Sequence, residues 1–100
     1  DRLTELANTD SLTGLANRNA IQDKIRTAIE DAAPGESVGV LFLDLDNFKK
    51  VNDHYGHVFG DRLICDVSSA IHACLNEGDA LARLGGDEFI VLATRCTAHD

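Results

Sequence analysis

The chain has 100 residues, of which 44% are hydrophobic and 26% are charged, and its formal net charge is −8. This length and composition suit one small soluble domain, and no stretch approaches the roughly 18 apolar residues of a membrane span. The acidic balance argues against a nucleic-acid partner, because such binding depends on Lys and Arg contacts with phosphates. The polar first residues are unlike a signal peptide, and three cysteines without CxxC spacing fit a cytoplasmic domain with reduced thiols.

The first half of the chain predicts a loop, a helix and a strand. We expect residues 1–9 to be the end of an incoming helix or linker, and Asn17 can cap the helix that follows. Apolar side chains at spacings of three and four predict an amphipathic helix, which Pro34-Gly35 ends. The apolar run at residues 38–43 predicts a strand buried on both faces. The inner face of the expected helix consists of Ile21, Ile25, Ala28, Ile29 and Ala32.

The second half predicts two helices followed by a β-hairpin. Residues 48–55 are helical in character, and a break at residues 56–60 leads to a longer helix. Two strand-like runs, residues 80–84 and 87–93, are separated by Gly85-Gly86. Glycine supplies the positive φ that a two-residue hairpin turn requires, so we expect the chain to turn on these two residues. The expected order of elements is α, β, α, α, β, β.

Carboxylates cluster where these strands end. Asp44 and Asp46 follow the buried strand, and Asp87 and Glu88 follow the glycine turn. If the strands pair, the carboxylates lie side by side and need a cation to neutralise them. Oxygen ligands suit Mg²⁺ or Mn²⁺. Because alternate side chains point to opposite faces of a strand, Asp44 and Asp87 could converge on a metal while Asp46 points elsewhere.

Each of these features also has a purely structural interpretation. Gly85-Gly86 alone would be an ordinary hairpin turn, and Asp44 alone a solvated strand end. An EF-hand loop that starts at Asp44 is excluded, because the positions that require Gly and Glu hold Lys49 and Tyr55.

The polar residues after the Asp pair have alternatives of the same kind. Lys49 and Lys50 lie at a helix start, where phosphate is favoured, or they are simply solvated. Asn52 and Asp61 could recognise the edge of a guanine, because a carboxylate accepts hydrogen bonds from the N–H groups on that edge. Asp61 could instead be a helix N-cap.

Three motifs, in order and spacing, resemble the GGDEF domain. They are DSLTGLANR at residues 10–18, LDLDNFKKVNDHYGH at residues 43–57 with Gly60-Asp61, and ARLGGDEF at residues 82–89. The likeness covers residues 10–100, which would be the amino-terminal part of that domain. It implies an α+β fold, the nucleotidyl-cyclase or ferredoxin-like palm, with the signature on a β-hairpin.

The resemblance also implies roles for the matching residues. Asp44, Asp87 and the carbonyl of Leu45 would bind two Mg²⁺ or Mn²⁺ ions. Asp87 would help to deprotonate the attacking hydroxyl, and Glu88 would support the signature loop near the metal. The residues implied to bind GTP are Asn47, Phe48 and Lys49 for the phosphates, Asn52 and Asp61 for guanine, and Gly85 and Gly86 at the turn.

The implied reaction joins two GTP molecules into cyclic di-GMP and pyrophosphate, in bacterial second-messenger signalling. Each domain binds one GTP, so catalysis requires a homodimer. The alternative is a GTP-binding regulatory domain attached to a cyclic di-GMP phosphodiesterase. The parent protein could also carry sensory domains, and it could be soluble or anchored to a membrane through segments outside the chain.

Two departures from the family pattern affect these expectations. Many members carry an inhibitory Arg-x-x-Asp site before the signature, but here Asn76 replaces the Arg while Asp79 is retained. The loss of the guanidinium predicts weak product inhibition. The family fold also continues beyond the signature strand. We therefore expect the first strand to lack a neighbour on one side. An exposed strand edge predicts either strand exchange with another chain or a longer parent protein. We expect residues 1–100 alone to be inactive.

Overall fold

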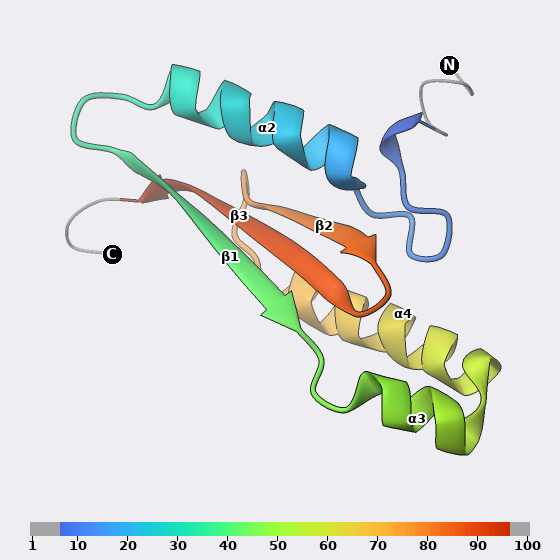
Figure 1. Cartoon of the computed structure of the whole chain (residues 1–100). Coiled ribbons are helices and arrows are strands. Elements are labelled where there is room, and N and C mark those ends of the chain that lie inside the picture. Colours follow the sequence, from blue (N-terminus) through green and yellow to red (C-terminus); the bar gives the residue numbers. More distant parts are fainter. Residues whose placement is uncertain (1–6, 97–100) are drawn as a thin grey trace.

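The computed structural model describes residues 7–96, and its elements follow the expected order (Figure 1). The helices and strands are α2 (Arg18–Asp31), β1 (Ser37–Asp44), α3 (Phe48–Tyr55), α4 (His57–Ala73), β2 (Ala80–Gly85) and β3 (Glu88–Cys96). Residues 7 and 8 are helical and Thr9 forms an isolated β-bridge with Ala16, whereas residues 1–6 of the expected incoming segment lie outside the described residues. No helix within the described part of the chain is both long and apolar enough to cross a bilayer.

The three strands form one antiparallel sheet in the order β1-β3-β2. β2 and β3 form the expected hairpin, but the position of its turn was predicted wrongly. β2 continues through Gly85, which pairs with Glu88, so the turn is Gly86-Asp87. An irregularity between Arg83 and Gly85 shifts the register by one residue. Gly86 takes a φ of 52°, which a residue with a side chain rarely adopts.

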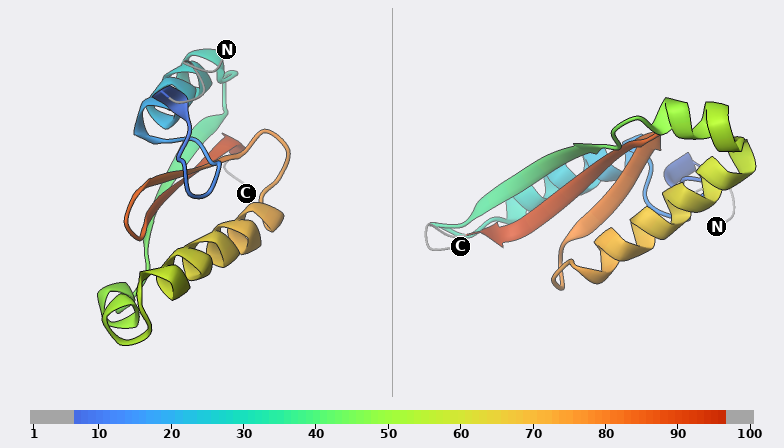
Figure 2. Two further views of the ribbon diagram at one scale, coloured as in Figure 1. Left: turned by 90° about the vertical axis from the view of Figure 1, so that its right-hand side faces the viewer. Right: turned by 90° about the horizontal axis from the view of Figure 1, so that it is seen from below.

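Two helices cover opposite faces of this sheet (Figure 2). On one face, Ile21 of α2 packs into a cluster with Ala82, Ile90 and Leu92. On the other face, Ile64 of α4 packs with Leu81 and Phe89. The two sets alternate along β2 and β3, as side chains of a strand must. The hairpin that carries the signature is therefore packed on both faces.

Two local predictions about α2 had different outcomes. Asn17 is the N-cap, and its Oδ1 accepts a hydrogen bond of 3.1 Å from the Ala20 N–H, as the sequence predicted. Ile29 was expected on the inner face but is exposed. It lies in the last turn of the helix, beyond the part of α2 that packs on the central cluster.

β1 is the edge strand, and the prediction that it is buried on both faces was wrong. Leu41 is 58% exposed and Phe42 is 73% exposed. β1 is hydrogen-bonded to β3 alone, and both covering helices pack most extensively on β2. The apolar run therefore forms a strand, but the other residues in the range 7–96 do not fully cover it. The expected absence of a neighbour on one side of this strand is confirmed for residues 7–96.

Candidate metal and nucleotide site

Pairing of β1 with β3 brings the predicted metal ligands together. Asp44 at the end of β1 is the register partner of Glu88, and the Leu45 N–H donates to the carbonyl of Asp87 at 3.4 Å. Asp87 lies in the hairpin turn, one residue before β3 begins. We call Asp44, Asp87 and Glu88 the acidic corner. Sequence reasoning anticipated this juxtaposition because it depends only on the two strands being neighbours.

The charge of the acidic corner is held at an energetic cost. A hydrogen bond that protonated Asp44 donates to Asp87 raises the pKa of Asp44 above its ordinary value of 3.8. The negative charge of Asp87 is the next cause, and burial and the charges of Glu88 and Asp46 contribute less. When two carboxylates share a proton in this way, a cation that replaces the proton also offsets their mutual repulsion.

The acidic corner fits a divalent ion that is bound partly by its substrate. No three His, Cys, Asp or Glu side chains among residues 7–96 are grouped so as to hold a metal ion by themselves. Mg²⁺, however, is commonly held by one or two carboxylates together with substrate phosphates and waters. Asp44 and Asp87 are such a carboxylate pair, so the residues present fit Mg²⁺ or Mn²⁺ that arrives with a nucleotide.

A half-buried arginine, which sequence reasoning missed, holds the signature turn. Arg83 Nε and Nη2 both donate to the Gly86 carbonyl, at 3.1 and 2.8 Å. Its Nη1 pairs with Asp10 at 3.0 Å, and the side chains of Arg83 and Asp10 are only 14% and 15% exposed. Asp10 also accepts from the backbone N–H and the hydroxyl of Thr13. The available signal was that the first quoted motif begins with the acidic Asp10 and the third contains the basic Arg83.

The ion pair predicts an acid-sensitive contribution to stability. Burial by itself would raise the pKa of Asp10, but hydrogen bonds from Thr13 and the pairing with Arg83 outweigh it, so its pKa lies below 3.8. A depressed folded-state pKa stabilises the fold above the unfolded-state value, and this stabilisation is lost as pH falls through the folded-state value. We expect Asp10→Asn to lower the melting temperature at pH 6 and to flatten its decline below roughly pH 4.

The measurement is thermal unfolding followed by circular dichroism across this pH range. Asp23→Asn is the matched control, because the pair of Asp23 with Arg26 has both side chains more than two-thirds exposed, at 69% and 67%. Exposed pairs contribute little to stability. An acid limb of Asp10→Asn identical to that of the wild type would contradict the prediction.

The predicted guanine-binding residues lie at the corner between α3 and α4. Asn52 on α3 is half-buried, and its Oδ1 is buried without a hydrogen-bond partner. Gly60 on α4 is buried against it, and a Cβ added to Gly60 would lie 2.8 Å from Asn52 Cγ. Asp61 is exposed beside Gly60. Since α4 begins at His57 with Gly56 as N-cap, Asp61 is inside the helix and its interpretation as an N-cap was wrong.

This corner has two features of a ligand site. A buried acceptor without a donor is unusual in a native protein, and an N–H donor of a ligand would satisfy it. Sequence reasoning quoted Gly60 within a motif but gave it no role of its own. It also placed a break at residues 56–60, which was wrong, because α4 begins at His57 and Gly60 lies inside the helix. Its lack of a side chain gives the Asn52 amide its space.

The predicted phosphate-binding residues surround the start of α3. Asn47 precedes the helix with a φ of 60°, and its side chain makes no capping bond. Lys49 is exposed in the first turn. Phe48 packs in the cluster of Ile64, Leu81 and Phe89, so its side chain is a core residue and only its backbone could meet a phosphate.

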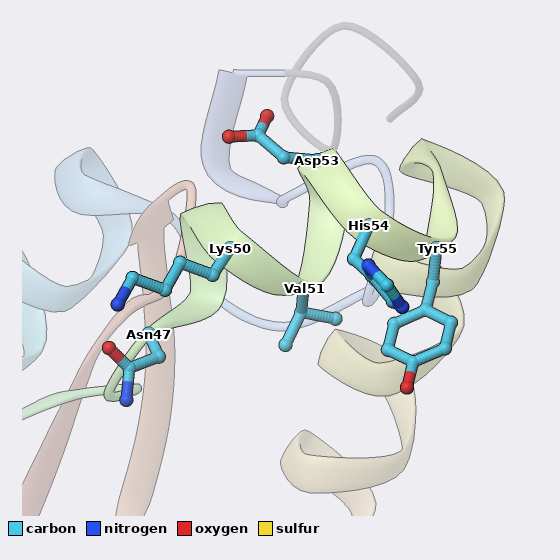
Figure 3. A pocket seen from close by; sticks show the side chains of 6 residues that line it. All are labelled: Asn47, Lys50, Val51, Asp53, His54 and Tyr55. Atoms are coloured by element: carbon cyan, nitrogen blue, oxygen red, sulfur yellow. The ribbon is translucent and has the colours of Figure 1, made fainter.

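An open pocket of about 550 Å³ lies on α3, and it differs from the predicted site. Figure 3 shows Asn47, Lys50 and Val51 along one side of α3, with His54 beside Tyr55. Of the predicted site residues it includes only Asn47; neither the acidic corner nor the Asn52 corner lines it. We keep the candidate site at the carboxylates and the unpaired amide, because these groups supply the acceptor atoms that the predicted chemistry requires.

The degenerate inhibitory motif lies at the opposite end of the hairpin from the signature turn. Asp79 Oδ2 accepts from the Asn76 N–H and its Oδ1 accepts from the Thr94 N–H, each at 3.1 Å. Both carboxylate oxygens therefore bind backbone groups and close the turn before β2. In the described structure, Asp79 anchors this turn to β3.

This arrangement predicts a structural role for Asp79. We expect Asp79→Ala to lower the free energy of unfolding by about 1–3 kcal/mol, because the Thr94 N–H loses its acceptor. Urea unfolding measures this change, with Glu77→Ala in the same turn as the control. Equal stability of the two variants would show that the two hydrogen bonds of Asp79 contribute nothing.

Comparisons with known proteins agree with this architecture. The family model described as diguanylate cyclase, GGDEF domain, matches residues 7–100. The chain is 64% identical over 94 residues to the cyclic di-GMP phosphodiesterase PdeR of Escherichia coli, covering 94% of the chain and 14% of PdeR. It is 44% identical over 91 residues to the diguanylate cyclase TpbB of Pseudomonas aeruginosa, covering 90% of the chain and 21% of TpbB.

A solved structure gives the same result for the fold. The GGDEF domain of DgcB from Caulobacter crescentus, in complex with c-di-GMP, matches with a TM-score of 0.83 and 39% identity. The match covers 93% of this chain and 55% of that chain. The expected α+β fold is therefore confirmed, and the chain spans about a fifth or less of the two curated relatives.

Proposed function

The chain belongs to the GGDEF family of diguanylate cyclase domains, and from this premise we propose that its parent condenses two GTP molecules into cyclic di-GMP and pyrophosphate. The observation that carries the proposal is the pair Asp44 and Asp87, held together beside a glycine turn. Asp44 and Asp87 are the carboxylates that would hold two Mg²⁺ or Mn²⁺ ions. Relatives named as cyclases and as phosphodiesterases support a role in bacterial cyclic di-GMP signalling.

The reaction is a displacement at phosphorus. The 3′-oxygen of one GTP forms a bond to the α-phosphorus of the other, the bond from that phosphorus to its bridging oxygen breaks, and pyrophosphate leaves. The hydroxyl proton passes to the carboxylate of Asp87, and Glu88 supports the turn beside it. Bound divalent ions would lower the pKa of the hydroxyl and offset the charge of the transferred phosphoryl group. A second such step closes the ring.

The remaining site residues would bind and orient GTP. Gly85 and Gly86 are exposed at the turn and leave the backbone open to a phosphate. Lys49 and the polar Asn47 at the start of α3 would receive the phosphates. The unpaired Oδ1 of Asn52 and the exposed carboxylate of Asp61 are acceptors for the N–H donors on the guanine edge.

The chemistry also implies a partner. One acidic corner and one guanine-binding corner bind one GTP, whereas the product joins two. Two copies of the domain must therefore face each other, at least transiently, and control of that encounter would control the activity.

A second candidate function is a GTP-binding regulatory domain next to a phosphodiesterase domain. The observation that favours it is the 64% identity to PdeR, which is named a cyclic di-GMP phosphodiesterase. The two functions share the same site and differ in turnover. Incubation of the full-length parent with GTP and Mg²⁺, followed by chromatography, separates them. Cyclic di-GMP that disappears in Asp87→Asn supports the cyclase, and bound but unchanged GTP supports the regulator.

We also expect weak binding of cyclic di-GMP at the degenerate inhibitory motif. Asn76 cannot make the bidentate contacts of an arginine, and Asp79 is already occupied by two backbone N–H groups. Titration calorimetry with cyclic di-GMP tests this expectation. Tight binding that Asp79→Asn abolishes while the fold persists would contradict it.

A further inference from the structure

Two loops that are distant in the sequence are joined by one half-buried side chain. Arg83 is the fourth residue of β2, and its guanidinium binds Asp10 on one side and the Gly86 carbonyl on the other. The guanidinium nitrogens Nε, Nη1 and Nη2 are all used in these contacts. Asp10 lies 73 positions earlier in the chain.

The loop that contains Asp10 is itself firmly held. Two groups of Thr13 donate to Asp10 Oδ2, at 2.9 and 2.7 Å. The Arg83 N–H donates to the Ala16 carbonyl at 3.0 Å, which joins this loop to β2 a second time. Asn17 donates from its backbone to the Asn8 carbonyl and from its side chain to the Ala7 carbonyl. Residues 7–17 and the signature turn are thus parts of one hydrogen-bonded unit.

Resting on the proposed function, we propose that Arg83 is a positioning residue for the metal site. Its two hydrogen bonds hold the carbonyl of Gly86, and the peptide unit that begins at this carbonyl continues into Asp87. Fixing it sets where the Asp87 carboxylate stands relative to Asp44. Asp10 in turn fixes the guanidinium. A shift of the loop at residues 10–17 would therefore change the geometry of the acidic corner through Arg83.

The chemistry of the contact requires arginine. A planar guanidinium can donate in several directions from one fixed plane, whereas a lysine ammonium is a compact point charge on a flexible stem. Arg83→Lys keeps the charge that Asp10 needs but cannot hold Asp10 and Gly86 at once. Groups that orient metal ligands typically change metal affinity by about 10- to 100-fold when they are removed.

The test compares Arg83→Lys and Asp10→Asn with Arg26→Lys and Asp23→Asn, the same substitutions in the exposed pair. Amide hydrogen exchange by NMR, without metal, reports the order of residues 86–88 directly. We expect exchange there to accelerate by about tenfold or more in both Arg83→Lys and Asp10→Asn, while amides at the centre of β3 stay protected. The two exposed-pair variants should match the wild type.

Binding of Mn²⁺ together with GTP, measured by calorimetry, is the second readout. We expect Arg83→Lys to weaken the Mn²⁺ affinity by about 10- to 100-fold. Unchanged exchange at residues 86–88, or an equal acceleration at every amide, would overturn the positioning role. If Arg83→Lys does not fold, Asp10→Asn decides alone, because it keeps the shape of the side chain. A wild-type chain that shows the exchange pattern but binds no Mn²⁺ would refute the proposed function and leave the coupling of the two loops intact.

Discussion

Asp87→Asn should abolish cyclic di-GMP synthesis by the parent protein and at the same time stabilise the metal-free domain at neutral pH. The first effect follows because Asp87 would supply one of the two carboxylates of the metal site and accept the hydroxyl proton. Loss of a metal-binding carboxylate removes several kcal/mol of transition-state stabilisation, so we expect a decrease in turnover on the order of a thousandfold.

The second effect follows from the raised pKa of Asp44. A carboxyl whose folded-state pKa lies above its unfolded-state value destabilises the fold at higher pH. That penalty disappears as pH falls through the folded-state pKa towards 3.8. Removing the charge of Asp87 removes the largest causes of the shift. The melting temperature of metal-free Asp87→Asn should therefore exceed that of the wild type at pH 7, and the difference should shrink towards roughly pH 4.

Chromatography of the parent protein after incubation with GTP and Mg²⁺ measures the first effect. Thermal unfolding with and without Mn²⁺ measures the second effect, together with the binding of the metal. Asp46→Asn is the matched control, since it makes the same change in net charge two residues from Asp44. We expect Asp46→Asn to retain the stabilisation by Mn²⁺ and Asp87→Asn to lose it. If Mn²⁺ still raised the melting temperature of Asp87→Asn, the metal site would have to be assigned to other residues.

Gly60→Ala should reduce GTP affinity by about 10- to 100-fold with little change in stability. Alanine is the better helix former by about 1 kcal/mol, which offsets part of the steric penalty. The new methyl group would lie 2.8 Å from Asn52 Cγ, and no real Cβ contact is that short. The amide of Asn52 must therefore leave the place from which its Oδ1 could accept from guanine. Losing one partner of a buried polar contact weakens binding by about 1–3 kcal/mol.

A double-mutant cycle with Asn52→Ala isolates this steric effect. In the Asn52→Ala background the collision is gone, so Gly60→Ala should stabilise the helix there and leave the already weakened GTP affinity unchanged. Urea unfolding gives the stabilities, and calorimetry with GTP and with ITP, which lacks the 2-amino group, gives the affinities. Ser69→Ala on the exposed part of α4 controls for substitution in the helix. Full GTP affinity in Gly60→Ala would show that Asn52 does not read the base.

Local sequence was sufficient for the elements themselves and for the pairing of carboxylates. α3 spans Phe48–Tyr55 as predicted, and Asn17 caps α2, because periodicity and capping act over a few neighbouring residues. The meeting of Asp44 with Asp87 needed only one further step, the pairing of two recognisable strands. Motif resemblance supplied the family, which the comparison with the family model confirms.

Only the tertiary structure decided which residues each of these elements contacts and how far each element is buried. An apolar run makes β1 a strand, but its place at the sheet edge leaves Leu41 and Phe42 exposed. The clamp of Arg83 on Asp10 and the space that Gly60 leaves for Asn52 are contacts between different segments of the folded chain. The reason is physical: backbone preferences and side-chain period are set within a few residues, whereas burial and partner choice depend on which surfaces the whole chain brings together.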